Sequence, residues 1–217
     1  MIRSPWPLSD LRIAVGRWEL RLPDERELGE FARSVAGEYN ASVPAQSKAD
    51  DSPDERARRV MQDHWRTRSE WSPEFWKLDL FAFEDGRVLG QQRLIGEHFA
   101  VLGEVTTGSV LRPDRRGAGI GTAMRAAILH LAFEELGALW ANTGAEPGNA
   151  ASLGVTAKFG YEPNGHRRMN MHGTVLDTAI FRLSAQRWRD WAAAFDVEVT
   201  GLDGLHALFG AKALRPA

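Results

Sequence analysis

The sequence predicts a mixed α/β fold of the α+β type, with a single domain over residues 1–217. Segments with the apolar spacing of helices are interspersed with shorter segments in which apolar and polar residues alternate, as they do in strands. Hairpin turns are expected toward both ends of the chain, as at Asp85-Gly86. Because the sequence shows neither an internal repeat nor a second apolar core, we expect one domain with a C-terminal tail over about residues 197–217.

The N-terminal third is expected to contain one strand and two helices. Apolar residues predict a strand over Leu11–Leu22, and helical spacing predicts a helix over Asp24–Tyr39. A loop rich in Ser, Pro and Asp follows at Asn40–Pro53. Ser52 before a proline and two acidic residues is typical of a helix start, so a second helix is expected to run to about Trp71.

The remaining elements follow from the same two periodicities. Alternation predicts strands at Lys77–Phe83, Val88–Glu97, Val105–Leu111, Ala138–Thr143, Arg167–His172 and Thr178–Leu183. Helical spacing predicts helices at Gly121–Leu136, Asn149–Phe159 and Ser184–Ala194, the last with Ser184 as its cap. The tail at Val197–Phe209 is apolar enough to pack on its own domain or on a second subunit, which leaves a homo-oligomer open.

Composition argues against several classes of protein. The formal net charge is −2, with acidic and basic residues mixed along the chain, so we expect no nucleic-acid partner. No apolar run of about 18 residues is present, so we expect no membrane partner, and residues 1–10 lack the pattern of a secretion signal. The absence of cysteine excludes a disulfide and a cysteine nucleophile. These absences predict a cytoplasmic protein.

The most informative segment joins an expected strand to the clearest helix. Three alternating glycines, Gly117, Gly119 and Gly121, stand between the two elements. Glycine allows the backbone to approach a ligand closely and to point successive N–H groups at it. The positive end of the following helix lies at the same place, and Arg115 and Arg116 add charge. This pattern predicts an anion site suited to a diphosphate.

Three other interpretations of the glycines are available. A P-loop requires a lysine after the last glycine, whereas the segment continues as Gly121-Thr122-Ala123. A dinucleotide fingerprint requires a third glycine at the position of Thr122, and its strand normally opens a βαβ series. The glycines alone are also consistent with a flexible turn between a strand and a helix that binds no ligand.

The segment resembles the signature Arg/Gln-x-x-Gly-x-Gly/Ala of the GNAT superfamily of acetyltransferases, with Arg116, Gly119 and Gly121 in the fixed positions. A second motif of that family resembles the downstream stretch Asn149–Ser152, followed by Phe159-Gly160-Tyr161. Landmarks of the RimJ/RimL branch, whose founding members modify N-terminal amines, are similar to Asp85-Gly86, Gly165, Asp177 and Trp188. The resemblance extends over roughly residues 11–191.

The resemblance implies a GNAT-like fold, with a central, twisted, mostly antiparallel sheet flanked by helices, and an acyl-CoA-dependent N-acyltransferase. It implies acetyl-CoA as the default co-substrate, with succinyl-CoA as an alternative, and a primary amine of a small molecule or a protein N-terminus as the acceptor. The strand before the glycines would separate from the next strand and bind coenzyme A along its edge. No residue spacing typical of a metal site appears. The implied cofactor-binding residues are Val110, Leu111, Arg112, Arg115, Arg116, Gly117, Ala118, Gly119, Ile120, Gly121, Thr122 and Asn149.

The resemblance also implies candidates for proton transfer. Ser152 is the candidate acid for the leaving thiolate, because Thr156 stands where many relatives carry a tyrosine. Asn149 would either bind a pantetheine amide or fix its own loop. Glu104 is the candidate base, with an exposed strand-end carboxylate as the alternative reading. The missing tyrosine leaves a second function open, that of a catalytically degenerate CoA-binding sensor or scaffold.

Two further groups have an ordinary and a functional interpretation. The cluster of Trp65, Trp71 and Trp76 either packs in the interior or forms an aromatic wall of an acceptor pocket. Arginines that could anchor an acidic acyl group, or lie on the surface, are Arg93, Arg167 and Arg168.

Overall fold

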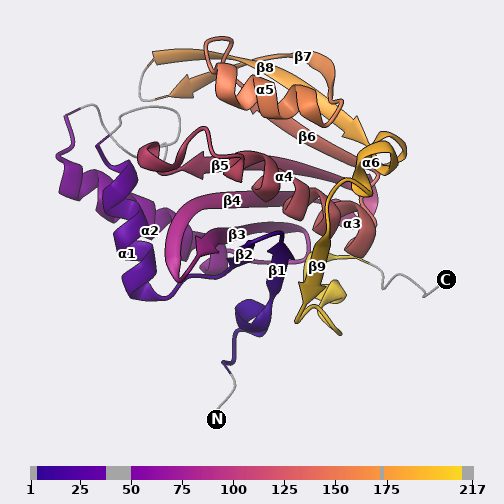
Figure 1. Ribbon diagram of the computed structural model, residues 1–217, viewed down its shortest axis with the longest axis horizontal. Helices are drawn as coiled ribbons and strands as arrows, with labels where there is room; N and C mark the ends of the chain where they lie inside the picture. The colour runs from indigo at the N-terminus through magenta and orange to yellow at the C-terminus, as the bar shows by residue number, and fades with distance from the viewer. Residues whose placement is uncertain (1–3, 38–49, 172–173, 212–217) are drawn as a thin grey trace.

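A computed structural model describes residues 4–37, 50–171 and 174–211 of the chain (Figure 1). Nine strands form one sheet in the order β7-β8-β6-β5-β4-β3-β2-β1-β9, and β5–β6 is its parallel pair among otherwise antiparallel neighbours. The predicted mixed fold with a mostly antiparallel sheet is therefore confirmed. The strands are β1 (Arg12–Val15), β2 (Trp18–Arg21), β3 (Phe75–Glu84), β4 (Arg87–Glu97), β5 (Glu104–Leu111), β6 (Trp140–Ala145), β7 (Glu162–Met171), β8 (Thr174–Ser184) and β9 (Val197–Thr200).

Helices cover both faces of the sheet. Successive residues of a strand point to opposite faces, and β3 shows this directly. Its Phe81 and Phe83 pack with α1 and α2, whereas its Leu80 and Ala82 belong to the core that includes α4. Helix α4 continues through a π-helical turn at Leu131–Glu135. The α-helices are α1 (Glu25–Val35), α2 (Pro53–Ser69), α3 (Phe99–Leu102), α4 (Ile120–His130), α5 (Ala150–Lys158) and α6 (Ala185–Ala192).

The helix starts agree with the local sequence. The Ser52 side chain accepts a hydrogen bond from the Glu55 amide, and the Glu55 side chain accepts one from the Ser52 amide. This reciprocal pair is a capping box. Ser184 accepts from the Arg187 amide and caps α6 as predicted. The first helix ends at Val35. The predicted loop at 40–53 lies mostly outside the described residues.

The two ends of the chain differ from the prediction. The single strand expected over 11–22 is a hairpin, β1–β2, because the chain reverses at Gly16 with φ of +58°. Strand β9, which the sequence did not predict, pairs with β1 at the edge of the sheet. Beyond it, Phe209 is completely buried against Trp71 and Trp76. The described part of the tail therefore packs on its own chain.

The tryptophan cluster has a packing role. Trp76 is completely buried, and its indole nitrogen donates to the Phe209 carbonyl at 2.9 Å. Trp71 stacks on Trp76 with ring centroids 5.9 Å apart. Trp65 is 41% exposed on α2 and does not join them. Trp71 and Trp76 therefore pack in the interior, and the three tryptophans do not form one cluster.

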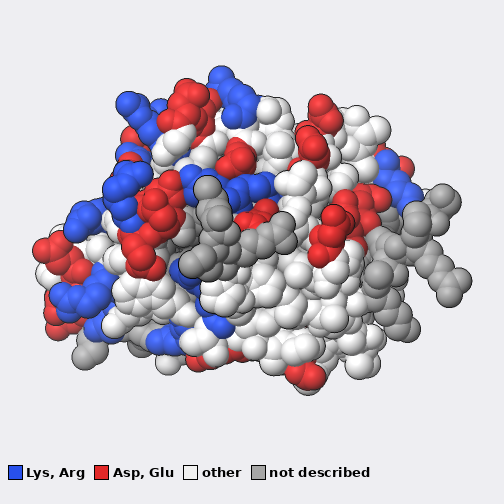
Figure 2. Space-filling view, turned by 90° about the horizontal axis from the view of Figure 1, so that it is seen from below, with Lys and Arg blue, Asp and Glu red and all other residues white. Residues whose placement is uncertain are grey.

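The surface adds two observations. Acidic and basic side chains are mixed on the face of the molecule that Figure 2 shows. Within the described ranges, no helix combines the length and apolar character that a bilayer crossing requires.

Candidate active site

Strands β5 and β6 separate part-way along their length. They pair from Glu104 with Trp140 to Thr107 with Thr143, and no pairing between them is formed beyond that point in the described sheet. Strand β5 continues to Leu111 with β4 as its partner, and β6 continues to Ala145 with β8 as its partner. The β6-facing backbone edge of residues 108–111 is therefore open to an extended ligand, which could bond there as a further strand would.

The glycine loop follows the C-terminal end of β5, next to this open edge. A short 3₁₀ turn, η2 (Pro113–Arg115), leads to Gly117 and Gly119, both with φ of +82°. The positive φ favours glycine at both positions. A Cβ atom at either glycine would meet no other atom within 4 Å, so the space beside the loop is open. Gly121 differs, because a Cβ there would lie 3.4 Å from Leu111 Cδ1.

Helix α4 begins at this loop without a side-chain cap. Gly119 is the N-cap residue and cannot itself provide one. The first amide groups of a helix carry partial positive charge and need acceptors. The uncapped start of this 11-residue helix, beside a loop with open space above its glycines, fits a diphosphate group.

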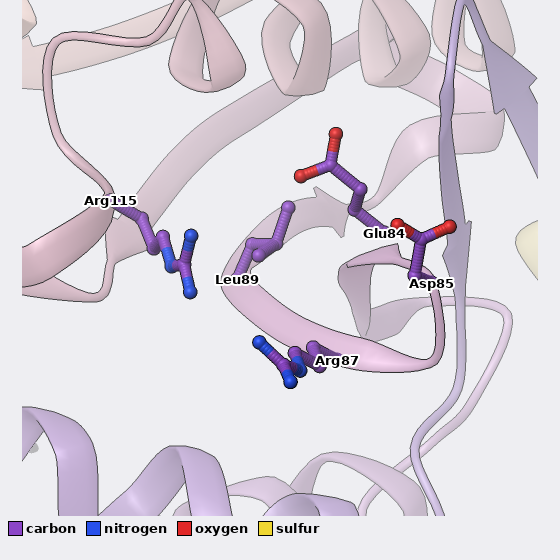
Figure 3. A pocket seen from close by; sticks show the side chains of 5 residues that line it. All are labelled: Glu84, Asp85, Arg87, Leu89 and Arg115. Atoms are coloured by element: carbon purple, nitrogen blue, oxygen red, sulfur yellow. The ribbon is translucent and has the colours of Figure 1, made fainter.

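The three predicted loop arginines have different surroundings. Arg112 bonds Glu30 of α1 and Asp114, both at 3.1 Å, so it ties the loop to α1. The Arg112 contact lowers the pKa of Asp114 below its usual value. Arg115 lines a cavity of about 400 Å³ between the loop and the β3–β4 hairpin. Figure 3 shows the guanidinium groups of Arg115 and Arg87 at this hollow, with Glu84 and Asp85 on its other side. Arg116 is exposed.

A second cavity of about 360 Å³ borders the start of α4. The loop therefore has a cavity lined by its Arg115 and another lined by its Gly119 and by Thr122. The walls of the second cavity also include Val15, Trp18, Lys158 and Phe195. It brings together the β1–β2 turn, α4, the end of α5 and the segment after α6.

The start of α5 holds the candidate acid. Asn149 is the N-cap, and its side chain accepts a hydrogen bond from the Ser152 amide at 3.0 Å, so Asn149 fixes its own loop. The Thr156 hydroxyl is buried and donates to the Ser152 carbonyl at 2.9 Å, and it therefore does not replace the missing tyrosine. The Ser152 side chain is half-buried and takes no part in the cap.

Glu104 belongs to a polar cluster across three strands. Its Oε1 lies 2.7 Å from Arg182 Nη2, and its Oε2 accepts from Asn142 Nδ2 at 3.1 Å. Arg182 also lies over the ring of Trp140 at 4.7 Å. No sequence pattern indicates Arg182 or Asn142, because only the register of β5, β6 and β8 brings them to Glu104.

A second cluster lies beside the same opening. Arg93 of β4 is opposite Gly108 of β5 and contacts Asp79 of β3 and Asp63 of α2. Burial opposes the charged form of Asp79, but the Arg93 guanidinium outweighs it and lowers the pKa of Asp79 to about 2. Since two carboxylates already engage Arg93, it is a poor anchor for an acidic acyl group. Arg167 and Arg168 are exposed on β7.

Residues 17–162 match the family model that describes the acetyltransferase (GNAT) domain. The match covers more than half of the chain and includes β5, the glycine loop, α4 and α5. The chain belongs to the GNAT acetyltransferase family. This GNAT membership confirms the family and the N-acyltransferase class that the motifs at Arg116–Gly121 and Asn149–Ser152 predicted.

Solved structures show the same GNAT fold at low sequence identity. RimJ of Mycobacterium smegmatis, in complex with CoA-disulfide, is 18% identical with a TM-score of 0.69, over 87% of this chain and 96% of that chain. RimL, a ribosomal L7/L12 α-N-protein acetyltransferase in complex with coenzyme A, is 17% identical with a TM-score of 0.60, over 80% and 97%. A chimera of spermidine N-acetyltransferase SpeG from Vibrio cholerae and hSSAT is 13% identical with a TM-score of 0.60, over 81% and 99%.

Proposed function

We propose that this GNAT protein transfers an acetyl group from acetyl-CoA directly to a primary amine. The observation that carries the proposal is the separation of β5 from β6 after Thr107, next to the uncapped start of α4. The open edge of β5 can bond the amides of a pantetheine arm. The free backbone amides at the start of α4, next to that edge, can bind a diphosphate. Bound there, acetyl-CoA would supply the activated acyl group.

The two sides of the opening suit different roles. Register places Arg93, Gly108, Asn142 and Arg182 on one face of the sheet, the face that α1 and α2 cover through Phe81. Helix α4 packs on the opposite face, and α5 contacts α4. We infer that the amine approaches from the α1–α2 face and that the thiol leaves toward α5, where Ser152 would protonate it.

Removal of the amine proton is assigned to Glu104 or to water. The Arg182 ion pair and the Asn142 amide fix the position of the Glu104 side chain. They also occupy both of its oxygens, so taking a proton weakens one of these contacts. An N-terminal amine with a pKa of about 7.7–8.0 needs less help than a lysine-like amine of about 10.4. The arrangement therefore favours N-terminal or similarly weakly basic amines.

A second function, that of a CoA-binding module without turnover, is favoured by Thr156. Purified protein incubated with acetyl-CoA or succinyl-CoA and a panel of amines, with free thiol followed over time, separates the two functions. We expect amine-dependent thiol release with acetyl-CoA. CoA binding without thiol release from any donor would favour the binding module, and the absence of CoA binding would contradict both.

A further inference from the structure

Arg125 is a buried cation in the second turn of α4. It is 3% exposed, and its Nε and Nη1 atoms have no hydrogen-bond acceptor in the part of the chain that the structure describes. Its guanidinium carbon lies 5.7 Å from the ring centroid of Tyr161, whose hydroxyl is also buried without a partner there. A cation–π contact offsets only part of the free energy lost when a guanidinium leaves water.

The position of Arg125 follows from Gly121, one turn earlier. Residues four apart lie on the same face of a helix. A Cβ at Gly121 would face Leu111 at the end of β5, at 3.4 Å, and Val155 of α5, at 3.9 Å. By this spacing Arg125 lies on the face of α4 that turns toward the end of β5 and α5, and its guanidinium lies near Tyr161, which follows α5. Arg125 is also about 6 Å further along the helix axis than Gly121.

We propose that Arg125 binds the pantetheine arm of coenzyme A, with its unpartnered N–H groups donating to a carbonyl oxygen of that arm. The inference rests on the proposed function and adds a side-chain contact to the backbone contacts of β5. A diphosphate at the loop would leave the arm to run past the next turn of α4, where Arg125 lies. A charged donor forms a strong hydrogen bond with an amide carbonyl. The hydroxyl of Tyr161, whose ring lies beside this guanidinium, is a second donor.

The test is the variant Arg125→Met, with Arg125→Lys as a second variant that keeps the charge. Methionine fills a similar volume without unpaired donors, so we expect the melting temperature of the ligand-free protein to rise by roughly 2–4 °C. Titration calorimetry should show CoA binding weakened about 10- to 100-fold. Binding of adenosine bisphosphate, which lacks the arm, should be unchanged. Arg125→Lys should weaken CoA binding less than Arg125→Met.

A higher melting temperature together with a weaker CoA affinity would distinguish an arginine that binds the ligand from one that stabilises the fold. Arg189→Met on α6, an exposed arginine, serves as the matched control and should alter neither quantity. CoA affinity equal to that of the unmodified protein, an equal loss for adenosine bisphosphate, or a lower melting temperature of the ligand-free Met variant would each overturn the proposal. If the unmodified protein binds no CoA, the proposed function fails; if it binds CoA and Arg125→Met binds it equally, only the role of Arg125 fails.

Discussion

Arg93 holds both carboxylate oxygens of Asp79 across neighbouring strands, with Nε–Oδ1 and Nη2–Oδ2 distances of 2.6 Å. The same guanidinium reaches Asp63 of α2 at 2.7 Å. Because Arg93 is also opposite Gly108, this ion pair fixes α2 against the sheet beside the opening between β5 and β6. The geometry of the proposed acceptor side depends on it.

Asp79→Asn should destabilise the protein in a pH-dependent way. The folded-state pKa of Asp79 is lowered from 3.8 to about 2, so its contribution is present above pH 4 and is lost as the pH falls toward 2. We expect the free energy of unfolding at pH 7 to fall by about 2 kcal/mol or more. Denaturant unfolding at several pH values measures this, and the gap between the two proteins should narrow below pH 4. Asp63→Asn, on the same guanidinium but 18% exposed, is the control and should have a smaller effect.

Gly119→Asp should abolish CoA binding while the protein stays folded. A carboxylate at the uncapped start of α4 would repel a diphosphate, and we expect the affinity to fall at least about 100-fold. The matched control is Gly204→Asp, because Gly204 has a similar φ of +75° and equally open surroundings. Calorimetric titration with CoA is the measurement. Unchanged affinity in a folded Gly119→Asp protein would contradict the assignment of the loop, and Gly121→Asp should behave in the same way with added strain against Leu111.

Ser152→Ala should lower turnover more than CoA affinity. The helix cap uses the Ser152 amide and the Asn149 side chain, so removal of the hydroxyl leaves the cap intact. We expect kcat to fall about 10- to 100-fold if the hydroxyl protonates the thiolate. Ser184→Ala, which removes the cap of α6, is the control and should affect stability alone. Equal rates for Ser152→Ala and the unmodified protein would make Ser152 a structural residue.

Glu104→Gln should slow the reaction selectively. Acetylation of a lysine-like amine should fall about 100-fold, and that of an N-terminal peptide amine should fall less, because roughly half or more of the latter is already neutral at pH 8. The kcat/KM values of paired acceptors, one of each kind, provide the measurement. Arg182→Met removes the ion pair but keeps the Glu104 side chain, so it measures how much the loss of the ion pair alone lowers kcat/KM. An equal decrease for both acceptors would indicate that Glu104 positions its neighbours and does not act as the base.

Phe209→Ala should destabilise the protein strongly. Phe209 is completely buried, with ring centroids 5.0 Å from Trp76 and 5.3 Å from Trp71. Removing it should lower the free energy of unfolding by about 3–5 kcal/mol. Thermal or denaturant unfolding measures the change, and CoA affinity of the folded fraction should stay the same. A decrease below about 1 kcal/mol would show that the tail contributes little.

The sequence predicted the features that local residues determine. The caps at Ser52 and Ser184 and the Asp85-Gly86 turn each depend on a few adjacent residues, and the structure has all three. Strand β9 was missed because its four residues gain their conformation from pairing with β1, far away in sequence. The β1–β2 turn was missed because Gly16 alone interrupts an otherwise strand-like segment.

The candidate site was predictable to the same extent. The glycine loop and the start of α5 are continuous segments, so their residue types and spacing could be recognised. Glu104 and Arg182 are 78 residues apart, and Arg93 and Asp63 are 30 apart, so only the register of the strands and the packing of α2 bring them together. No local pattern distinguishes the buried Arg125 from an ordinary surface arginine of α4.

The pairing of residues 12–15 with residues 197–200 also has a consequence for protein synthesis. In a chain emerging from the ribosome, β1 is made before the other strands of the sheet, but the strand that covers its outer edge is made after all of them. Long-range pairing of this kind slows folding, and an uncovered strand edge can pair with another chain. Products that terminate before residue 197 would therefore keep this edge exposed and be prone to self-association.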